Sequence, residues 1–306
     1  MSYMTARTGA FAYARYGWET SFRAGASTRN IAFGRGVRVS SISANHNAEL
    51  IYELGVREAQ AWAFKQFEGS LSLEWIFSSP WIFKAVMGSV ATTGTSPPYT
   101  HTYTKTKLPP SFEVEVGTQL SGASFARLFR GCFVNTLTLT ASVNELLRAS
   151  LEAYYAIEAS RTAYGTALYD TMEPATFVSA TLELPNGTVL GEVQSFELTI
   201  NNNALRVFGL GSAYANSAVW QNFDATGRIS ITMKDASFLD MLRGSVSNGK
   251  FVVTTSSGTV TFNFSDLIFG EHTLSIEPNT LIVEDVPVLI RDIPSIVATN
   301  NTGTHP

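Results

Sequence analysis

Few residues in this sequence have the types and spacing that chemistry needs. The chain of 306 residues holds four histidines and one cysteine, which are His46, His101, His272, His305 and Cys132. None of the histidines stands at metal-ligand spacing from a carboxylate or from the cysteine, so we expect no metal site. A single cysteine excludes an internal disulfide, and its place at the start of an apolar stretch predicts a buried, unreactive thiol.

Two further patterns imitate functional motifs. Residues 33–36 (Phe-Gly-Arg-Gly) suggest a phosphate loop, but the Gly-Lys-Ser/Thr ending and a following helix are missing, so the pattern predicts a turn. Glu113 and Glu115 could mimic a carboxylate pair, yet alternate charges on a solvated strand face are the simpler interpretation. No Gly-x-Ser-x-Gly motif occurs. We therefore expect no catalytic residue, no cofactor and no enzyme.

The composition predicts a packed protein with an unusually neutral surface. Hydrophobic residues make up 45% and aromatic residues 12% of the chain, which is ample for a core. Charged residues are only 15%, and neutral polar surface tolerates burial against other subunits. A net charge of −4 and the lack of Lys/Arg blocks argue against a basic groove for nucleic acid.

No targeting or membrane segment is evident. Residues 1–7 contain no apolar run, and no window approaches 18 uninterrupted apolar residues. We expect a soluble protein that is made in the cytoplasm and does not enter a membrane.

One long stretch of the chain is written twice. Residues 45–55 (Asn-His-Asn-Ala-Glu-Leu-Ile-Tyr-Glu-Leu-Gly) have a counterpart in residues 201–211 (Asn-Asn-Asn-Ala-Leu-Arg-Val-Phe-Gly-Leu-Gly). Each copy continues through a polar and aromatic loop, with Trp62 in one and Trp220 in the other. Duplication favours a structural, symmetric role.

Both copies then pass through a glycine into a strand and a short helix. Gly69 precedes the alternating residues 70–77, and Gly227 precedes residues 228–233. The helices are expected at 80–88, with Ser79 as N-cap, and at 236–244, each ending at a glycine.

The remaining segments predict more strands. Residues 100–104 and 112–116 suggest a hairpin with a proline-stiffened connection, and residues 251–255 and 259–264 suggest another. Residues 146–157 suit a helix or a strand, and the likeness of the two halves favours the strand.

We expect a mainly β protein of two tandem β-sandwich or barrel domains, each with a short flanking helix. The first domain spans residues 31–165 and the second spans 166–291. Residues 1–30 are expected to form an N-terminal arm that packs on another surface, such as that of a neighbouring subunit. Residues 292–306 form a C-terminal tail, flexible from about residue 293.

These features resemble the tail tube (major tail) proteins of long-tailed bacterial or archaeal viruses, in the type with two tandem tube domains. The resemblance rests on residues 16–22 (Tyr-Gly-Trp-Glu-Thr-Ser-Phe), the unit 45–88 and residues 128–134 (Leu-Phe-Arg-Gly-Cys-Phe-Val). It recurs over about 177–244 and so covers most of the chain.

The resemblance implies a virion protein that stacks in rings to form a hollow tube for the viral DNA. In that family each domain gives strands to a barrel that lines the lumen, and six domains make a ring. Two domains per chain then imply a trimeric ring with pseudo-sixfold symmetry. A hexamer with the second half outside is the competing arrangement.

The same resemblance implies the partners and the place of action. Tape-measure, tail-terminator and tail-tip proteins are the expected partners besides the chain itself. DNA would pass through the lumen without specific binding, and the tail would be assembled in the host cytoplasm. The alternative function is that of a secreted or surface β-sandwich adhesin or carbohydrate-binding protein.

Lumen surfaces should be polar and not basic, so that DNA slides without phosphate contacts. Faces of that character occur in both halves, although the arginine among them departs from the expectation. The lumen-facing candidates are Ser70, Ser72, Glu74, Thr136, Thr138, Thr140, Arg228, Ser230, Thr232, Thr273, Ser275 and Glu277.

The loops at 56–68 and 212–226 are long for hairpin connections and carry aromatic residues among small polar ones. We expect them to bridge neighbouring subunits or successive rings, a self-packed surface loop being the alternative. The candidates for these contacts are Trp62, Phe64, Phe67, Tyr214, Trp220 and Phe223.

Overall fold

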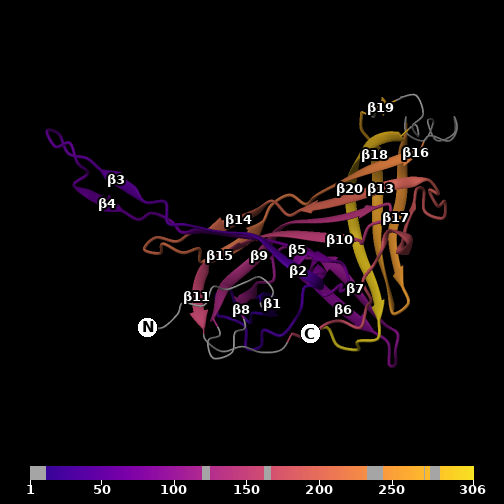
Figure 1. The fold of residues 1–306 in the computed structure, drawn as a ribbon, viewed down its shortest axis with the longest axis horizontal. Coiled ribbons are helices and arrows are strands. Elements are labelled where there is room, and N and C mark those ends of the chain that lie inside the picture. Colours follow the sequence, from indigo (N-terminus) through magenta and orange to yellow (C-terminus); the bar gives the residue numbers. More distant parts are fainter. Residues whose placement is uncertain (1–11, 119–124, 162–166, 233–243, 272, 276–282) are drawn as a thin grey trace, which may run out of the picture.

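The protein is built almost wholly from antiparallel β-strands (Figure 1). The computed structural model describes residues 12–118, 125–161, 167–232, 244–271, 273–275 and 283–306. The strands up to residue 161 are β1 (Ala12–Trp18), β2 (Arg35–Asn45), β3 (Glu49–Ile51), β4 (Ala61–Ala63), β5 (Glu68–Ile76), β6 (Gly88–Thr93), β7 (Tyr99–Lys105), β8 (Phe112–Thr118), β9 (Phe125–Ser142), β10 (Arg148–Tyr155) and β11 (Ile157–Arg161). Those that follow are β12 (Ala180–Glu183), β13 (Val193–Asn201), β14 (Ala204–Val207), β15 (Ser217–Trp220), β16 (Asp224–Thr232), β17 (Ser245–Thr255), β18 (Gly258–Phe269), β19 (Thr273–Ser275) and β20 (Val283–Asn300). The predicted mainly β class is confirmed.

One large curled sheet runs through both halves of the chain. Its strand order is β12-β17-β18-β20-β16-β13-β9-β10-β5-β2. The ambiguous segment at 146–157 is therefore a strand, β10, as favoured. The pairing of β9 with β13 joins the two halves, and buried side chains from both form one hydrophobic cluster beneath the sheet.

Alternation along the strands decides which face of the sheet is covered. Leu71, Leu73 and Trp75 of β5 are buried, while the residues between them remain partly exposed. Because successive strand residues point to opposite faces, the sheet acquires one apolar face and one polar face.

Helical structure is minor. Among the described residues there is one short α-helix, α1 (Phe83–Met87), and one turn of 3-10 helix, η2 (Phe177–Ser179). Helix α1 begins later than expected, with Ile82 and not Ser79 at its N-cap position, and ends before Gly88 as predicted. Gly88 has a φ of 113°, a conformation that favours glycine. The helix expected at 236–244 lies, apart from its final glycine, outside the described residues.

The hairpin predicted from residues 100–104 and 112–116 does not form. Strand β7 pairs with β6 and β20, whereas β8 pairs with β1 and β9. Each strand thus pairs with its other neighbour along the chain, β6 or β9, and with one distant strand, β20 or β1, about which local turn signals carry no information.

The C-terminal segment is not a flexible tail. Strand β20 extends to Asn300, and alternate side chains such as Ile293 and Ile296 are buried. Beyond the strand, the indole Nε1 of Trp18 donates a hydrogen bond to the carbonyl oxygen of Pro306 at 2.7 Å. The segment is held because it packs against the N-terminal part of the fold.

Candidate functional site

The predicted lumen residues of both halves lie on one face of the continuous sheet, here called the polar face. Its members in the described strands are Ser70, Ser72, Glu74, Thr136, Thr138, Thr140, Arg228, Ser230 and Thr232. Cross-strand register aligns them in rows: one row runs from Ser72 through Glu152 and Thr136 to Asn201. The face is therefore shared by strands from both halves.

The seam between the halves belongs to this face. Thr138 of β9 is the register partner of Thr199 of β13, and their hydroxyl oxygens are 3.1 Å apart. Such a cross-strand Thr–Thr pair is polar and uncharged, and it supports the joint.

Several members of the polar face escaped the sequence analysis. Ser150 and Glu152 belong to β10, whose helical spacing concealed their alternation, and Glu197 and Thr199 belong to β13. The signal that could have found them is the same polar alternation that revealed the β5 residues.

Two ion pairs lie on the polar face. The guanidinium of Arg228 lies 3.0 Å from an oxygen of Asp285, and that of Arg148 lies 3.0 Å from Glu74. Exposed pairs of this kind contribute about 0–1 kcal/mol each. Their main effect is that Arg228 does not make this surface basic.

The last three lumen candidates are only partly described. Thr273 and Ser275 lie in β19, where Thr273 is the register partner of Asp285 and Ser275 of Val283. Glu277 lies outside the described residues. Within the part of the chain that the structure describes, β19 pairs with β20 alone.

The two loops predicted for assembly both form hairpins with the same entry turn. Asn47 and Asn203 have φ values of 47° and 46°. Each backbone N–H donates to the side chain of the asparagine two residues earlier, Asn45 or Asn201. Each side-chain amide also donates to a carbonyl 19 residues later, at 2.9 Å in both cases. The repeat is thus present in hydrogen-bonding geometry.

The second hairpin, β14–β15, packs on the first half of its own chain. The backbone N–H of Asn202 donates to the backbone carbonyl of Asn135 at 2.8 Å, and the indole Nε1 of Trp220 donates to the backbone carbonyl of Val134 at 3.2 Å. The guanidinium of Arg206 lies 4.2 Å from the ring centroid of Tyr154. Burial lowers the pKa of Arg206 and raises that of Tyr154, as a desolvated contact requires.

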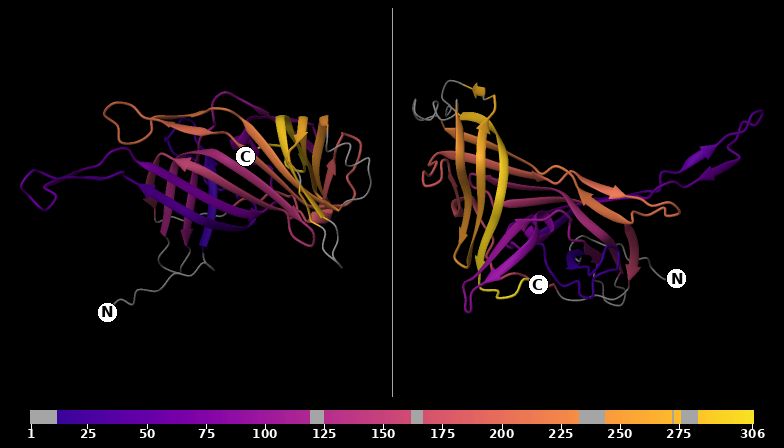
Figure 2. Two further views of the ribbon diagram at one scale, coloured as in Figure 1. Left: turned by 90° about the horizontal axis from the view of Figure 1, so that it is seen from above. Right: turned by 180° about the vertical axis from the view of Figure 1, so that it is seen from behind.

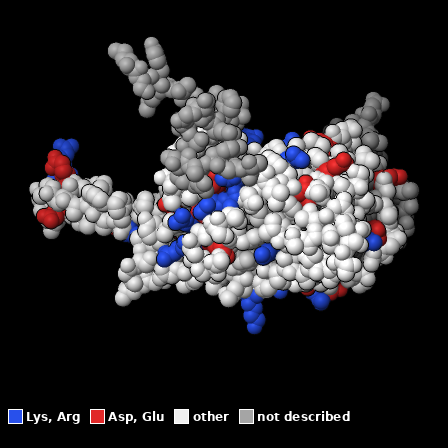
Figure 3. Space-filling model, turned by 90° about the horizontal axis from the view of Figure 1, so that it is seen from below, with Lys and Arg blue, Asp and Glu red and all other residues white. Residues whose placement is uncertain are grey.

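The first hairpin, β3–β4, stands away from the body as an arm comprising residues 46–66 (Figures 1 and 2). Charged side chains gather at its far end, while much of its length shows none (Figure 3). Trp62 is 61% exposed and Phe64 is 59% exposed. The two rings pack edge to face on each other, with centroids 4.5 Å apart.

Register corrects the sequence match between the hairpins. Leu50 is opposite Trp62, and Arg206 is opposite Ala218. With the asparagine turns superposed, Trp220 corresponds to Phe64 and Ala218 corresponds to Trp62. The same superposition matches Gly69 with Ala225 and not with Gly227. Because side chains alternate along a strand, this shift of two residues leaves each one on the same face.

The other aromatic candidates contact their own chain. Phe67 is buried, its amide donates to the carbonyl of Ala213 at 2.8 Å, and its ring lies 5.5 Å from that of Tyr214. The ring of Phe223 is covered by the ammonium of Lys105 at 4.5 Å. Phe67, at the base of the arm, therefore packs on the loop between β14 and β15, and Phe223 lies just after β15.

The carboxylate pair proved to be buried and not solvated. Glu113 binds the guanidinium groups of Arg29 and Arg130, at 2.5 and 3.0 Å, and Glu115 binds Arg15 at 2.7 Å. These arginines lie on β1, the segment after it and β9, so the ion pairs clamp the N-terminal segment to β8. Strand β1 therefore packs within its own chain. Removing one member of these ion pairs would leave the other as a buried, unpaired charge.

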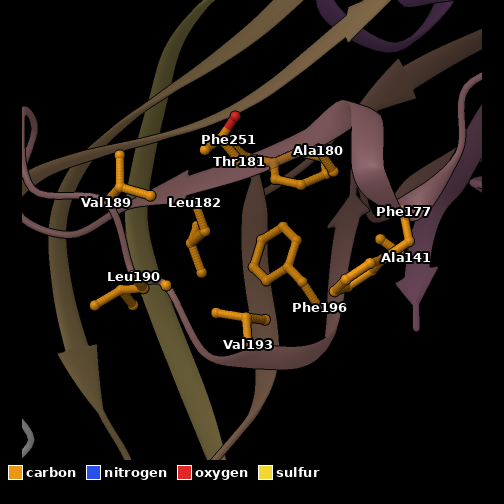
Figure 4. Close-up of a pocket in the computed structure, with 11 residues that line it drawn as sticks. Ala141, Phe177, Ala180, Thr181, Leu182, Val189, Leu190, Val193, Phe196 and Phe251 are labelled. Atoms are coloured by element: carbon orange, nitrogen blue, oxygen red, sulfur yellow. The ribbon is translucent and has the colours of Figure 1, made fainter. Parts of the chain in front are cut away.

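Cys132 and the other described residues that could do chemistry lie outside these ion pairs. Burial raises the pKa of the Cys132 thiol well above its usual value, as expected for an unreactive group. Among the described residues no group of three His, Cys, Asp or Glu side chains could hold a metal ion. The cavity between β12, β13 and β17 is lined by apolar residues such as Leu182, Phe196 and Phe251 (Figure 4).

The part of the chain that the structure describes contains no helix with the length and hydropathy of a membrane span.

A family comparison agrees with the geometry. The model of the phage tail tube protein family matches residues 12–290, nearly the whole chain. The protein belongs to the phage tail tube family, a class of structural virion proteins located in the tail. No curated protein matches the chain.

Proposed function

We propose that the protein polymerises as stacked rings into a hollow tail tube, with the polar face lining the bore. The observation that carries the proposal is the continuity of this face across β5, β10, β9, β13 and β16. A surface with paired charges and hydroxyl groups lets DNA slide, because few phosphate contacts hold it.

The joint inside the chain supplies a template for ring closure. The part of β9 from Thr136 to Thr140 pairs with β10 on one side and with β13 on the other. Strand β19 holds the matching place in the second half, since Asp285 pairs with Thr273 as Ser150 pairs with Thr138. The outer edge of β19 would therefore receive a strand that corresponds to β13.

The strand that corresponds to β13 is β2 of another copy. Ala44 of β2 pairs with Gly69 as Ile200 of β13 pairs with Ala225. Within the described residues β2 pairs with β5 alone, so its outer edge is open. Pairing the two edges between copies removes a liability that open sheet edges otherwise carry.

Each copy then contributes two equivalent segments to one closed barrel, which supports a trimeric ring of pseudo-sixfold symmetry. A hexamer with the second half outside fits less well, because β13 and β16 continue the polar face of the first half without a break. The expected partners are tape-measure, tail-terminator and tail-tip proteins, and assembly takes place in the host cytoplasm.

Electron microscopy of concentrated protein tests the tube directly. We expect hollow tubes whose rings contain three copies, and a persistent monomer or a solid fibre would contradict the proposal. The bore assignment is tested with Thr138→Cys, since Cys132 is buried. A small maleimide should label this variant in tubes and in monomers, whereas a bulky polymer-linked maleimide should label only monomers. Equal labelling of tubes by both reagents would place Thr138 outside.

A further inference from the structure

The arm carries an apolar face that the rest of the described chain leaves more than half exposed. Leu50 and Trp62 are direct cross-strand partners, and Phe64 follows on the same face of the hairpin. Their exposed fractions are 57%, 61% and 59%. Large exposed hydrophobic side chains gathered on one projecting hairpin mark an interaction surface.

A second exposed apolar pair lies at the far end of the molecule. Ile268 of β18 and Leu289 of β20 are register partners, and both are more than half exposed. They are strand residues on the polar-face side of the sheet, next to the rows described above. Two large aliphatic side chains facing each other on an otherwise polar face indicate a contact surface.

The first half shows what covers this position. Phe133 of β9 and Tyr154 of β10 are register partners at the corresponding place. Tyr154 pairs with Ser70 of β5 as Leu289 pairs with Thr226 of β16, and Ser70 and Thr226 are equivalent when the asparagine turns are superposed. The β14–β15 hairpin lies on that pair. Ala204 and Ala218 pack on Phe133, with Trp220 and Tyr154 beside them, and Arg206 stacks on Tyr154.

The two hairpins and the two strand pairs differ in complementary ways. Small Ala218 packs with large Phe133, and at the other site the corresponding residues are large Trp62 and smaller Ile268. Cationic Arg206 faces aromatic Tyr154. At the other site the corresponding residues, Leu50 for Arg206 and Leu289 for Tyr154, are both aliphatic. Each exchange on a hairpin thus has a matching exchange on the surface that would receive it, in size or in polarity.

The arm cannot reach this surface in its own chain. It projects from the β2–β5 end of the sheet, and β18 and β20 lie toward the opposite end (Figures 1 and 2). The partner that carries a matching Ile268–Leu289 pair is a second copy.

We propose that the arm of one copy docks on the Ile268–Leu289 pair of the next copy in the same ring, as β14–β15 docks on Phe133 and Tyr154. Leu50 then lies on Leu289, Trp62 on Ile268, and Phe64 beside them. This inference rests on the proposed tube function and adds the partner surface and the direction of the contact. In the packing of β14–β15, a hairpin of one half docks on the neighbouring half of the same chain. The corresponding contact of the arm therefore joins neighbouring copies within one ring.

Cysteine cross-linking in assembled tubes tests the contact. The variant with Leu50→Cys and Leu289→Cys, treated with a short bismaleimide, should give a closed trimer band on a denaturing gel. The control pair Leu50→Cys and Val189→Cys uses a position of similar exposure, 54% against 57% for Leu289, and it should not cross-link. Tubes that form without the Leu50–Leu289 link overturn the docking inference and leave the tube function standing. Ladders longer than a trimer overturn it too, since they place the arm between rings. Failure of the unaltered protein to form tubes overturns the tube function itself.

A rescue experiment gives an independent readout. Leu50→Arg alone should raise the critical concentration for tube assembly at least about tenfold. Adding Leu289→Tyr recreates the Arg206–Tyr154 pair and should bring the critical concentration back to within about threefold of the original. Circular dichroism of the monomers checks that each variant is folded. A double variant that assembles no better than Leu50→Arg contradicts the proposal.

Discussion

The two hairpins begin with the same asparagine turn and then have opposite fates. The β14–β15 hairpin lies on the first half of its own chain, where Trp220 donates to the carbonyl of Val134 and Arg206 stacks on Tyr154. The β3–β4 arm has the same register but leaves Trp62 exposed. The difference teaches that a hairpin can pack within the fold in one copy of a repeat and remain exposed in the other.

The largest expected effect comes from the arm. Replacing Trp62 and Phe64 together by alanine should raise the critical concentration for tube assembly about 100-fold, because aromatic anchors dominate interfaces. The thermal midpoint of the monomer should not change, since both side chains are solvated there. Light scattering gives the first quantity and calorimetry the second. A monomer that loses stability would show that the arm packs on its own chain and would break the comparison.

The second effect falls on the packed hairpin. Trp220→Ala should lower the free energy of unfolding by about 2–3 kcal/mol, because the half-buried indole loses its packing and its hydrogen bond. Urea unfolding of the monomer measures this. Trp62→Ala is the matched control, with an expected change below about 0.5 kcal/mol. Equal losses for the two tryptophans would erase the distinction drawn between the hairpins.

A third effect concerns His305, a C-terminal residue that lies close to Lys84 of α1. Burial, followed by the charge of Lys84, lowers the pKa of His305 to about 4. The unfolded chain then binds more protons than the folded chain below pH about 6.5. Stability from this group is present above that pH and is lost as the pH falls toward 4, by about 1–3 kcal/mol.

The measurement is the unfolding free energy at pH 7 and at pH 4.5, for the original protein and for His305→Gln. The variant should lose less stability between the two pH values, because it has no proton to bind at this site. A loss as large as that of the original protein would assign the pH dependence to other groups.

The smallest effect tests what the hairpins share. Asn47→Ala and Asn203→Ala should each cost about 1 kcal/mol in monomer stability, since alanine disfavours positive φ and the side-chain hydrogen bonds vanish. Replacement by glycine should cost less at both positions, because glycine tolerates this conformation. Chemical unfolding of the four variants compares them. Unequal costs at the two turns would indicate that the equivalence ends before the hairpins begin.

Much of the fold could be predicted because strand alternation is a local property. The alternation of Ser70, Ser72 and Glu74 with Leu71 and Leu73 correctly predicted a strand with one polar side. The same logic failed for Glu113 and Glu115, whose alternation suggested a solvated face. Their arginine partners Arg15, Arg29 and Arg130 come from other segments, and only long-range pairing reveals that both faces of β8 are covered.

The sequence by itself determined the β class, the repeated hairpin unit and the polar alternation on the strands of both halves, since each depends on neighbours within one segment. Only the tertiary structure decided that β9 pairs with β13 and merges these strands into one polar face. It also decided that β14–β15 is covered and the arm is not. Strand partners and packing surfaces come from segments far apart in the chain, and no local pattern records which of them meet.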